Sequence, residues 1–172
     1  MHDFRPQTCC FTGHRDIPDD EVQKIRIRMF YRFQELVERG YLYFGVGGAL
    51  GFDTMAAEFL LEYRRSHRQI KIIEVLPFKE YRNRWTPEQQ HDAEMRDRLM
   101  DKIVYCCNEP SKEAYLVRDR HLVDCSSACI SYCNRATGGT AYTVRYALQQ
   151  GIPVLNSSSF DVHRLLENHH SF

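Results

Sequence analysis

Two short segments combine glycines with hydrogen-bonding residues in a way that suits phosphate binding. The first covers residues 45–53 and reads GVGGALGFD, and the second is Gly138-Gly139-Thr140. Each separates an apolar run from a helix-like run, so free backbone amides at a helix N-terminus would face an anion. One pocket lined by both turns would suit a phosphorylated ribose. The alternative is that the glycines only allow a helix to pack closely on a strand.

The spacing of the first segment matches neither of two familiar nucleotide motifs. It lacks the GxGxxG pattern with a ribose-binding acid, and it does not end in the Lys-Ser/Thr of a P-loop. Both mismatches disfavour a nicotinamide-dependent dehydrogenase and a P-loop nucleoside triphosphatase.

A third turn, Thr12-Gly13-His14-Arg15, follows the first apolar run. The glycine allows close backbone approach, and the hydroxyl and the guanidinium could both bind a phosphate. His14 could act as a general acid or base, although a lone histidine on a loop is more often simply solvated. A plain connecting turn is the competing interpretation.

Three further side chains could line the same pocket. Trp85, the only tryptophan, could stack on a base or could plug the edge of the sheet. Arg118 and Arg120 could pair with a phosphate, although charged residues on a helix usually face solvent. The expected ligand-binding residues are Thr12, Gly13, Arg15, Gly47, Gly48, Gly51, Asp53, Trp85, Arg118, Gly138, Gly139 and Thr140.

The seven cysteines are expected to pack in the core. They lie mostly inside apolar, strand-like runs, and no CxxC pair occurs. Adjacent cysteines on a strand point to opposite faces, so one such pair cannot hold a single metal ion. We therefore expect no metal site and no bound cofactor.

The elements that must position these residues alternate between strands and helices. Apolar runs at 8–11, 42–44, 70–76, 102–106, 128–132 and 152–155 predict strands. Helices are expected from Asp19 or Asp20 to Gly40, from Asp53, from Pro87, and over 113–123, 140–149 and 160–167. No Asn-Gly hairpin signal occurs. The pattern predicts a single α/β, Rossmann-like domain over residues 1–172, with a mainly parallel sheet and helices on both faces.

The overall charge indicates which kinds of partner to expect. Lys plus Arg and Asp plus Glu both number 23, so the formal net charge is zero. A protein that binds nucleic acid through its phosphates usually has a basic excess, so nucleic acid is an unlikely partner.

The polar first residues and the lack of a long apolar stretch predict a cytoplasmic protein with no membrane contact.

The ordered set of motifs resembles the SLOG superfamily, which unites the Lonely Guy phosphoribohydrolases with the DNA-processing A (Smf) proteins. Within it, the chain is most similar to the YpsA-like branch. The similarity covers roughly residues 8–155. Its matching pieces are Thr12-Gly13-His14-Arg15, GGALGFD at 47–53, Ala56-Ala57-Glu58, Pro77-Phe78 with Trp85, Arg118 ahead of Val123-Asp124, Ser126-Ser127-Ala128, and Gly138-Gly139-Thr140.

This resemblance implies a Rossmann-like fold that binds nucleotides or nucleotide-derived ligands, and in some members hydrolyses an N-glycosidic bond. The hydrolases carry a Gly-Gly-x-Gly-Thr-x-x-Glu pattern whose glutamate assists cleavage at the ribose. Here residues 138–145 read GGTAYTVR, with Val144 and Arg145 where an acid is expected and Ala141 in place of a glycine. Asp53 and Glu58 are the acids that could substitute, and they are the candidate catalytic residues.

Three functions follow from these observations. The favoured one is a sensor or regulatory protein that binds a nucleoside phosphate or an ADP-ribose-like molecule. The second is a phosphoribohydrolase-like N-glycosidase that uses Asp53 or Glu58 as general acid or nucleophile. The third is a DNA-binding protein related to the DNA-processing A family. The resemblance also implies a homodimer or larger assembly and a regulatory role in growth or stress signalling.

Overall fold

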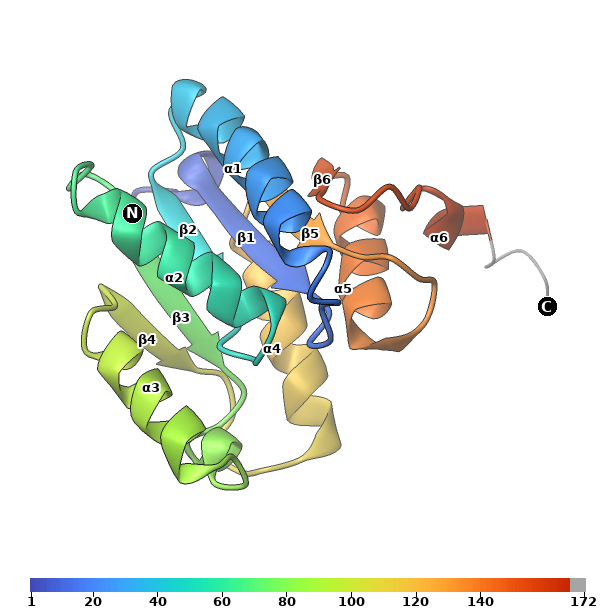
Figure 1. Cartoon of the computed structure of the whole chain (residues 1–172). Coiled ribbons are helices and arrows are strands. Elements are labelled where there is room, and N and C mark those ends of the chain that lie inside the picture. Colours follow the sequence, from blue (N-terminus) through green and yellow to red (C-terminus); the bar gives the residue numbers. More distant parts are fainter. Residues whose placement is uncertain (168–172) are drawn as a thin grey trace.

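The computed structural model describes residues 1–167 and contains one parallel sheet (Figure 1). Every paired strand runs in the same direction, in the order β4-β3-β2-β1-β5-β6. The strands are β1 (Thr8–Gly13), β2 (Tyr43–Val46), β3 (Lys71–Leu76), β4 (Lys102–Tyr105), β5 (Ala128–Tyr132) and β6 (Val154–Asn156). This arrangement confirms the predicted α/β fold.

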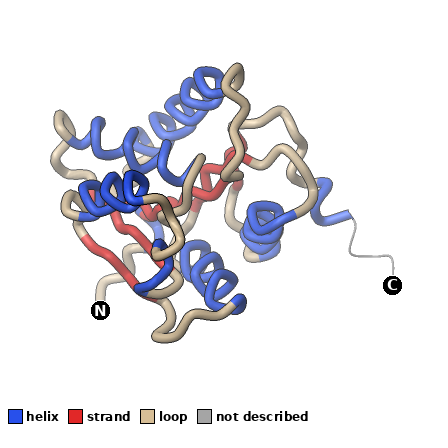
Figure 2. The backbone as a smooth tube through the Cα atoms, turned by 60° about the horizontal axis from the view of Figure 1, so that its bottom comes forward, coloured by secondary structure: helices blue, strands red, loops and turns tan. Residues whose placement is uncertain are grey.

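Helices cover both faces of the sheet. On one face lie α1 (Val22–Glu38), α2 (Phe52–Arg64) and α3 (Pro87–Asp97), and the first two cross in front of the sheet in Figure 1. The other face carries α4 (Lys112–Asp124) and α5 (Gly138–Gln149), and Figure 2 shows the sheet between the two helical layers. Three short helices complete the chain: η1 (Arg5–Gln7), η2 (Lys79–Arg82) and α6 (Arg164–Glu167).

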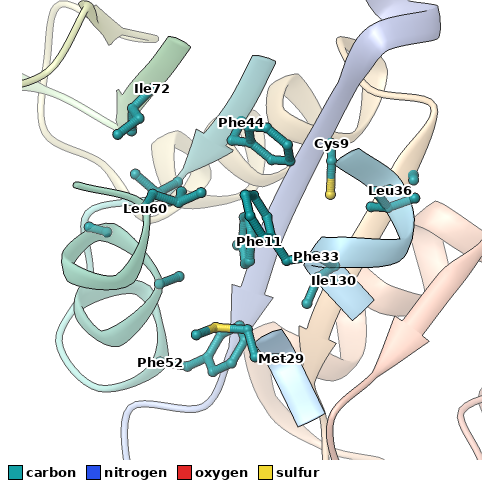
Figure 3. Close-up of a cluster of buried hydrophobic side chains, with 14 of the residues drawn as sticks. Cys9, Phe11, Met29, Phe33, Leu36, Phe44, Phe52, Leu60, Ile72 and Ile130 are labelled. Carbon is teal, nitrogen blue, oxygen red and sulfur yellow. The ribbon is translucent and has the colours of Figure 1, made fainter. Parts of the chain in front are cut away.

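The core on the α1–α2 face is built largely from aromatic rings. Phe11 and Phe44 project from neighbouring strands and meet Phe33 of α1 and Phe52 of α2, and all four are fully buried (Figure 3). Removing such a side chain from water contributes about 1.5–3 kcal/mol. The packing of Phe52 also fixes the first turn of α2 against β1, which matters for the site below.

The opposite face has a core of smaller side chains. Cys10, Cys129 and Ala147 pack there with Leu122 and Val123. Of the seven cysteines, four are buried, two are partly buried, and Cys125 is exposed at the end of α4. The expectation that the cysteines serve packing therefore describes four of them well. All seven are free thiols.

Several predicted boundaries differ from the structure. The helix expected from residue 140 begins at Gly138, because glycines fit a helix start as well as the loop before it. The first helix begins at Val22 after Glu21 and has no side-chain cap, so Asp19 and Asp20 do not cap it. Along residues 1–167, no helix is long and apolar enough to cross a membrane.

The strand order creates a topological switch point between β1 and β5. From β1 the chain proceeds to β2 on one side, whereas from β5 it proceeds to β6 on the other. The two strands pair as far as Gly13 and Tyr132, and His14 N–H donates to the Tyr132 carbonyl at 3.1 Å. Ligands of open parallel sheets bind in the crevice outside such a point.

Candidate ligand-binding site

A cavity of about 370 Å³ opens at this switch point. Its volume lies within the range of small-molecule sites in proteins. It is bounded by the loop after β1, the start of α2, one side of α4 and the N-terminus of α5. The residues that line it are Thr12, Gly13, His14, Arg15, Asp16, Ala49, Asp53, Tyr115, Leu116, Arg118, Asp119, Arg135, Gly138, Gly139, Thr140 and Thr143.

The N-terminus of α5 is open to the cavity. Its N-cap residue, Thr137, makes no side-chain cap, and the first turn contains no acidic residue. The first four amides of a helix have no partner within the helix, and here they carry the positive end of the helix dipole. A Cβ placed on Gly138 or Gly139 would meet no atom within 4 Å. This turn therefore combines free amide donors with empty space, which is what an anion site requires.

The loop after β1 forms the neighbouring wall. Gly13 has no space for a side chain, since a Cβ there would lie 2.4 Å from the Phe52 ring. Glycine at this position therefore lets α2 pack against β1. Arg15 is exposed at the cavity, and its Nη2 donates to the Tyr81 hydroxyl at 3.3 Å. The guanidinium can reach a bound anion without first leaving a buried ion pair.

The buried side chains of Asp53 and Arg118 form the inner wall of the cavity. Arg118 is 6% exposed; its Nη1 donates to the Gly47 carbonyl and its Nε to Asp119 at 2.7 Å. Its guanidinium also lies over the Tyr81 ring, 5.7 Å from the centroid. These neighbours raise the pKa of Arg118, which therefore stays charged.

Asp53 has an unusual environment for a carboxylate. It is 7% exposed, and its Oδ2 accepts the Ala49 amide at 3.2 Å. Burial raises its pKa to about 6, against the opposing effects of Arg118 and the Ala49 amide. A carboxyl that titrates near neutral pH at a cavity wall is a candidate for proton transfer as well as for hydrogen bonding.

The cavity is lined by residues of both glycine-rich turns, but the turn after β2 contributes other residues than its glycines. Gly47, Gly48 and Gly51 lie outside the lining, whereas Ala49 and Asp53 contribute to it. The reason is steric: a Cβ on Gly47 would lie 2.7 Å from Asp53 Oδ2 and 3.3 Å from Arg118. Protein groups already fill the space around this turn.

Gly48 and Gly51 show the same crowding. Both have positive φ angles, +70° and +79°. A Cβ on Gly48 would lie 2.4 Å from Leu76, and one on Gly51 would lie 2.2 Å from the backbone oxygen of Arg15. These positions need glycine for conformation and close approach of the chain, the packing alternative raised by the sequence.

A second charged cluster, formed by Arg82, Glu74 and Asp97, contacts this turn at the Gly48 carbonyl. Arg82 donates to the Gly48 carbonyl at 3.3 Å, to Glu74 at 2.7 Å, and to both oxygens of Asp97 at 2.9 and 2.8 Å. Glu74 is 2% exposed, and burial together with the neighbouring Asp97 raises its pKa. The cluster joins β3, η2 and α3 to the glycine turn.

Two of the residues singled out from the sequence lie outside the cavity. Trp85 packs edge-on against Tyr81, with ring centroids 5.7 Å apart, and under the Arg82 guanidinium. The ring is partly buried against a cluster that includes Leu76 and Phe78. Glu58 is an exposed side chain on α2 that pairs with Arg96 of α3 at 3.5 Å. It does not line the cavity, so the structure leaves Asp53 as the candidate acid of the two.

The structure adds lining residues that sequence patterns did not single out. Tyr115 supplies the aromatic ring that Trp85 was expected to provide, and Asp119 follows Arg118 on the same helix. Arg135 lies on the loop after β5 and pairs with Asp16 at 3.0 Å. Arg118 and Asp119 follow Tyr115 by three and four positions, and residues with this spacing share a helix face. This spacing is the sequence signal that could have indicated all three as neighbours in one site.

Within residues 1–167, no three His, Cys, Asp or Glu side chains gather in a way that could hold a metal ion. The site is therefore described by its amides, its guanidinium groups and its carboxyl groups alone.

Comparison with known proteins identifies relatives of the chain. A family model for YpsA, described as the YspA SLOG family, matches residues 9–153. Among curated proteins, a UPF0398 protein of Ligilactobacillus salivarius (strain UCC118) is 23% identical over 97 residues. The aligned part makes up 56% of this chain and 51% of that relative. The chain thus spans about half the length of the curated relative it matches.

Two solved structures share the fold. DNA processing protein A from Streptococcus pneumoniae superposes with a TM-score of 0.63 at 16% identity, covering 94% of this chain and 56% of that one. DNA processing protein A from Helicobacter pylori, studied for its single-stranded DNA binding mode, gives 0.61 at 19% identity, covering 95% and 73%. At these identities the likeness supports the Rossmann-like fold alone.

Proposed function

The chain belongs to the YspA SLOG family, and from that premise we propose that its switch-point cavity binds the phosphate of a small nucleotide-derived ligand. The observation that carries this proposal is the uncapped N-terminus of α5, where Gly138 and Gly139 leave free space in front of free amides. The phosphate lies on these amides, within reach of the exposed Arg15.

The remaining walls suit the rest of a nucleoside phosphate. Asp53 and Asp119 present carboxylate oxygens that accept hydrogen bonds from sugar hydroxyls. Tyr115 supplies an aromatic ring on which a base can stack. The cavity is therefore polarised, with amides and guanidinium groups for the phosphate and carboxylates for the sugar.

A sensor or regulatory protein fits this site better than a hydrolase of the related motif. Val144 is fully buried, and Arg145 donates through Nε to the Leu165 carbonyl at 3.0 Å, so neither provides an acid at the cavity. We propose that the bound ligand is retained as a signal rather than consumed.

The experiment is a thermal-shift and calorimetric screen with ADP-ribose, NAD, AMP and other nucleoside monophosphates. Gly139→Val places a side chain in the phosphate space, and its Cβ meets no atom within 4 Å. We expect it to weaken binding at least tenfold while the melting temperature changes little. Gln149→Val, at the exposed far end of the same helix, is the matched control and retains binding. Equal binding by wild type and Gly139→Val would exclude this phosphate site.

An N-glycosidase is the second candidate, and Asp53 is the observation that favours it. Its pKa of about 6 keeps a sizeable protonated fraction near neutral pH, as a general acid requires. Each ligand from the screen is therefore assayed for released base. Base release that is lost in Asp53→Asn would make the protein an enzyme.

Single-stranded DNA binding is the third candidate. The H. pylori relative of the same fold binds single-stranded DNA, which weakens the expectation that nucleic acid is an unlikely partner. A groove of about 780 Å³ beside α2 contains Arg64, Arg65, Arg68 and Lys71. Three of these cations are paired with carboxylates: Arg64 and Lys71 with Asp101, and Arg65 with Glu62. Binding to an oligonucleotide that weakens steeply with salt would favour this function.

A further inference from the structure

His14 contacts the end of β5 and the start of α2 at the edge of the cavity. Its backbone amide donates to the Tyr132 carbonyl at 3.1 Å, at the end of β5. Its backbone carbonyl accepts the Phe52 amide at 3.2 Å, at the first residue of α2. Its ring packs edge-on against Tyr132, with the centroids 5.8 Å apart. The residue is 4% exposed, so its ring is held in place on several sides.

The side chain makes one contact that depends on its protonation state. The backbone amide of Asn134 donates to His14 Nε2 at 3.2 Å. A backbone N–H can only donate, so Nε2 must be the unprotonated nitrogen of the ring. The proton of neutral His14 is then on Nδ1. Protonation at Nε2 would set two N–H groups against each other and break this contact.

The Asn134 hydrogen bond helps to hold the loop that leads into α5 in place. The backbone from Tyr132 to Gly138 connects the end of β5 to the open helix N-terminus. Within it, the Cys133 amide and carbonyl are bound by Asn156, at 3.0 and 2.9 Å. From the β1 side, the same loop is held by the His14 ring and by the Arg135–Asp16 ion pair.

The charged surroundings favour the neutral imidazole. Burial and the cation of Arg135 lower the pKa of His14 below its ordinary value of 6.5, and Asp16 opposes them weakly. The titratable and charged groups around the ring are Arg15 and Asp16 on its own loop, Tyr132 on β5, Arg135 on the loop before α5, Asp53 on α2, and Arg118 with Asp119 on α4.

We propose that His14 is a positioning residue that joins the loops after β1 and β5 only while its ring is neutral, so that protonating it weakens ligand binding at α5. The second half of this inference rests on the proposed phosphate site, whereas the first half concerns the free protein. The sign follows directly: the contribution of this contact to affinity is present above the lowered pKa of His14 and is lost as the pH drops through it.

The first test needs no ligand. Long-range proton–nitrogen NMR of the full chain, with His14→Gln used to assign the signals, reports which ring nitrogen carries the proton. We expect the Nδ1-protonated form at pH 7.5, a midpoint below 6.5, and an Asn134 amide resonance that follows the same midpoint. An Nε2-protonated ring, or an Asn134 amide that ignores the titration, overturns the inference whatever the ligand proves to be.

The second test measures affinity for ADP-ribose at pH 7.5 and at one pH unit below the His14 midpoint found by NMR. This probe is chosen because its phosphates lack the proton step near pH 6 that a phosphate monoester has. Loss of the Asn134–His14 hydrogen bond predicts an affinity about fivefold lower at the lower pH, even though the new positive charge by itself attracts the phosphates. Absence of ADP-ribose binding at either pH counts against the proposed function and leaves the NMR result as the test of His14.

Two variants identify the titrating group. The amide oxygen of His14→Gln can accept the Asn134 N–H and does not titrate, so this variant should bind within about threefold of wild type at pH 7.5 and lose the pH step. His91→Gln, an exposed histidine on α3, should keep the step. All of these comparisons are made in an Asp53→Asn background, because the Asp53 carboxyl titrates near pH 6 and would add a step of its own. A step that persists in His14→Gln would show that another group is responsible.

Discussion

The two glycine-rich turns of this protein look alike in sequence and differ in structure. At the turn after β2, protein atoms occupy the space where side chains would begin. A Cβ added to Gly47, Gly48 or Gly51 would lie 2.2–2.7 Å from the nearest side-chain or backbone atom. At the turn before α5, a Cβ on Gly138 or Gly139 would meet nothing within 4 Å. One turn is closed and the other is open.

The hydrogen bonds follow the same division. In the closed turn, Arg118 and Arg82 bind the carbonyls of Gly47 and Gly48, and Asp53 binds the Ala49 amide. In the open turn the helix start has no side-chain cap. A turn can bind phosphate only through amides that remain free, and in the closed turn the Ala49 amide is already bound to Asp53.

The largest effect is expected from removing the brace of the closed turn. Arg82→Met leaves the buried Glu74 and the partly buried Asp97 without their cation. Breaking a buried pair in this way costs about 3–5 kcal/mol of unfolding free energy. Urea unfolding measures it, with the exposed neighbour Arg84→Met as the control. A variant as stable as wild type would show that the closed turn does not depend on this cluster.

A pair of alanine substitutions compares the two turns directly. Gly51→Ala forces a Cβ against the Arg15 backbone at a positive φ, for an expected loss of about 2–4 kcal/mol. Gly139→Ala adds a methyl to open space in a helix and should change stability by less than about 1 kcal/mol, in the stabilising direction. Thermal unfolding of both proteins decides between them. Equal destabilisation would remove the distinction between a closed and an open turn.

Asp53 binds the closed turn and lines the cavity, and it makes the stability of the protein depend on pH. Its pKa is about 6 in the folded protein and near 3.8 when unfolded, so the folded state binds the proton more tightly. Stability contributed by the protonated form is present at low pH and is lost as the pH rises toward 6. Between pH 4.5 and 7.5 this amounts to roughly 2 kcal/mol.

Asp53→Asn should remove that pH-dependent loss. Urea midpoints at the two pH values, measured for wild type, Asp53→Asn and the exposed control Asp92→Asn, test it. The control should follow wild type. A difference between wild type and Asp53→Asn that does not vary with pH would contradict a raised pKa for Asp53.

The smallest effect is expected from Glu58→Gln. The side chain is 62% exposed and its ion pair with Arg96 is long, so its removal should cost less than about 1 kcal/mol. Ligand affinity, measured by calorimetry, should stay within about twofold of wild type, since Glu58 lies outside the cavity. A large loss of affinity would move the ligand toward the outer side of α2.

The sequence predicted the fold well because every strand contains a mostly apolar run. The six strands were all expected, with ends shifted by two residues or fewer, and parallel order follows from their alternation with helices. The start of α5 was missed by two residues, because Gly138 and Gly139 read equally well as loop.

The site was harder to predict because it depends on which loops meet. Strand order places β1 between β2 and β5, so the loop after β1 separates the two glycine-rich turns. Sequence spacing does not contain that order. Trp85 attracted attention because tryptophan is rare, but Tyr81 and Arg82 determine where its ring lies.

The most direct test of the central claim is an amide NMR titration of the full chain with AMP and, separately, with inorganic phosphate. The account predicts that the amide resonances of Gly138, Gly139 and Thr140 move most, and that those of Gly47 and Gly48 move little. Larger shifts at Gly47 and Gly48, or no shift at the start of α5 with either probe, would contradict it.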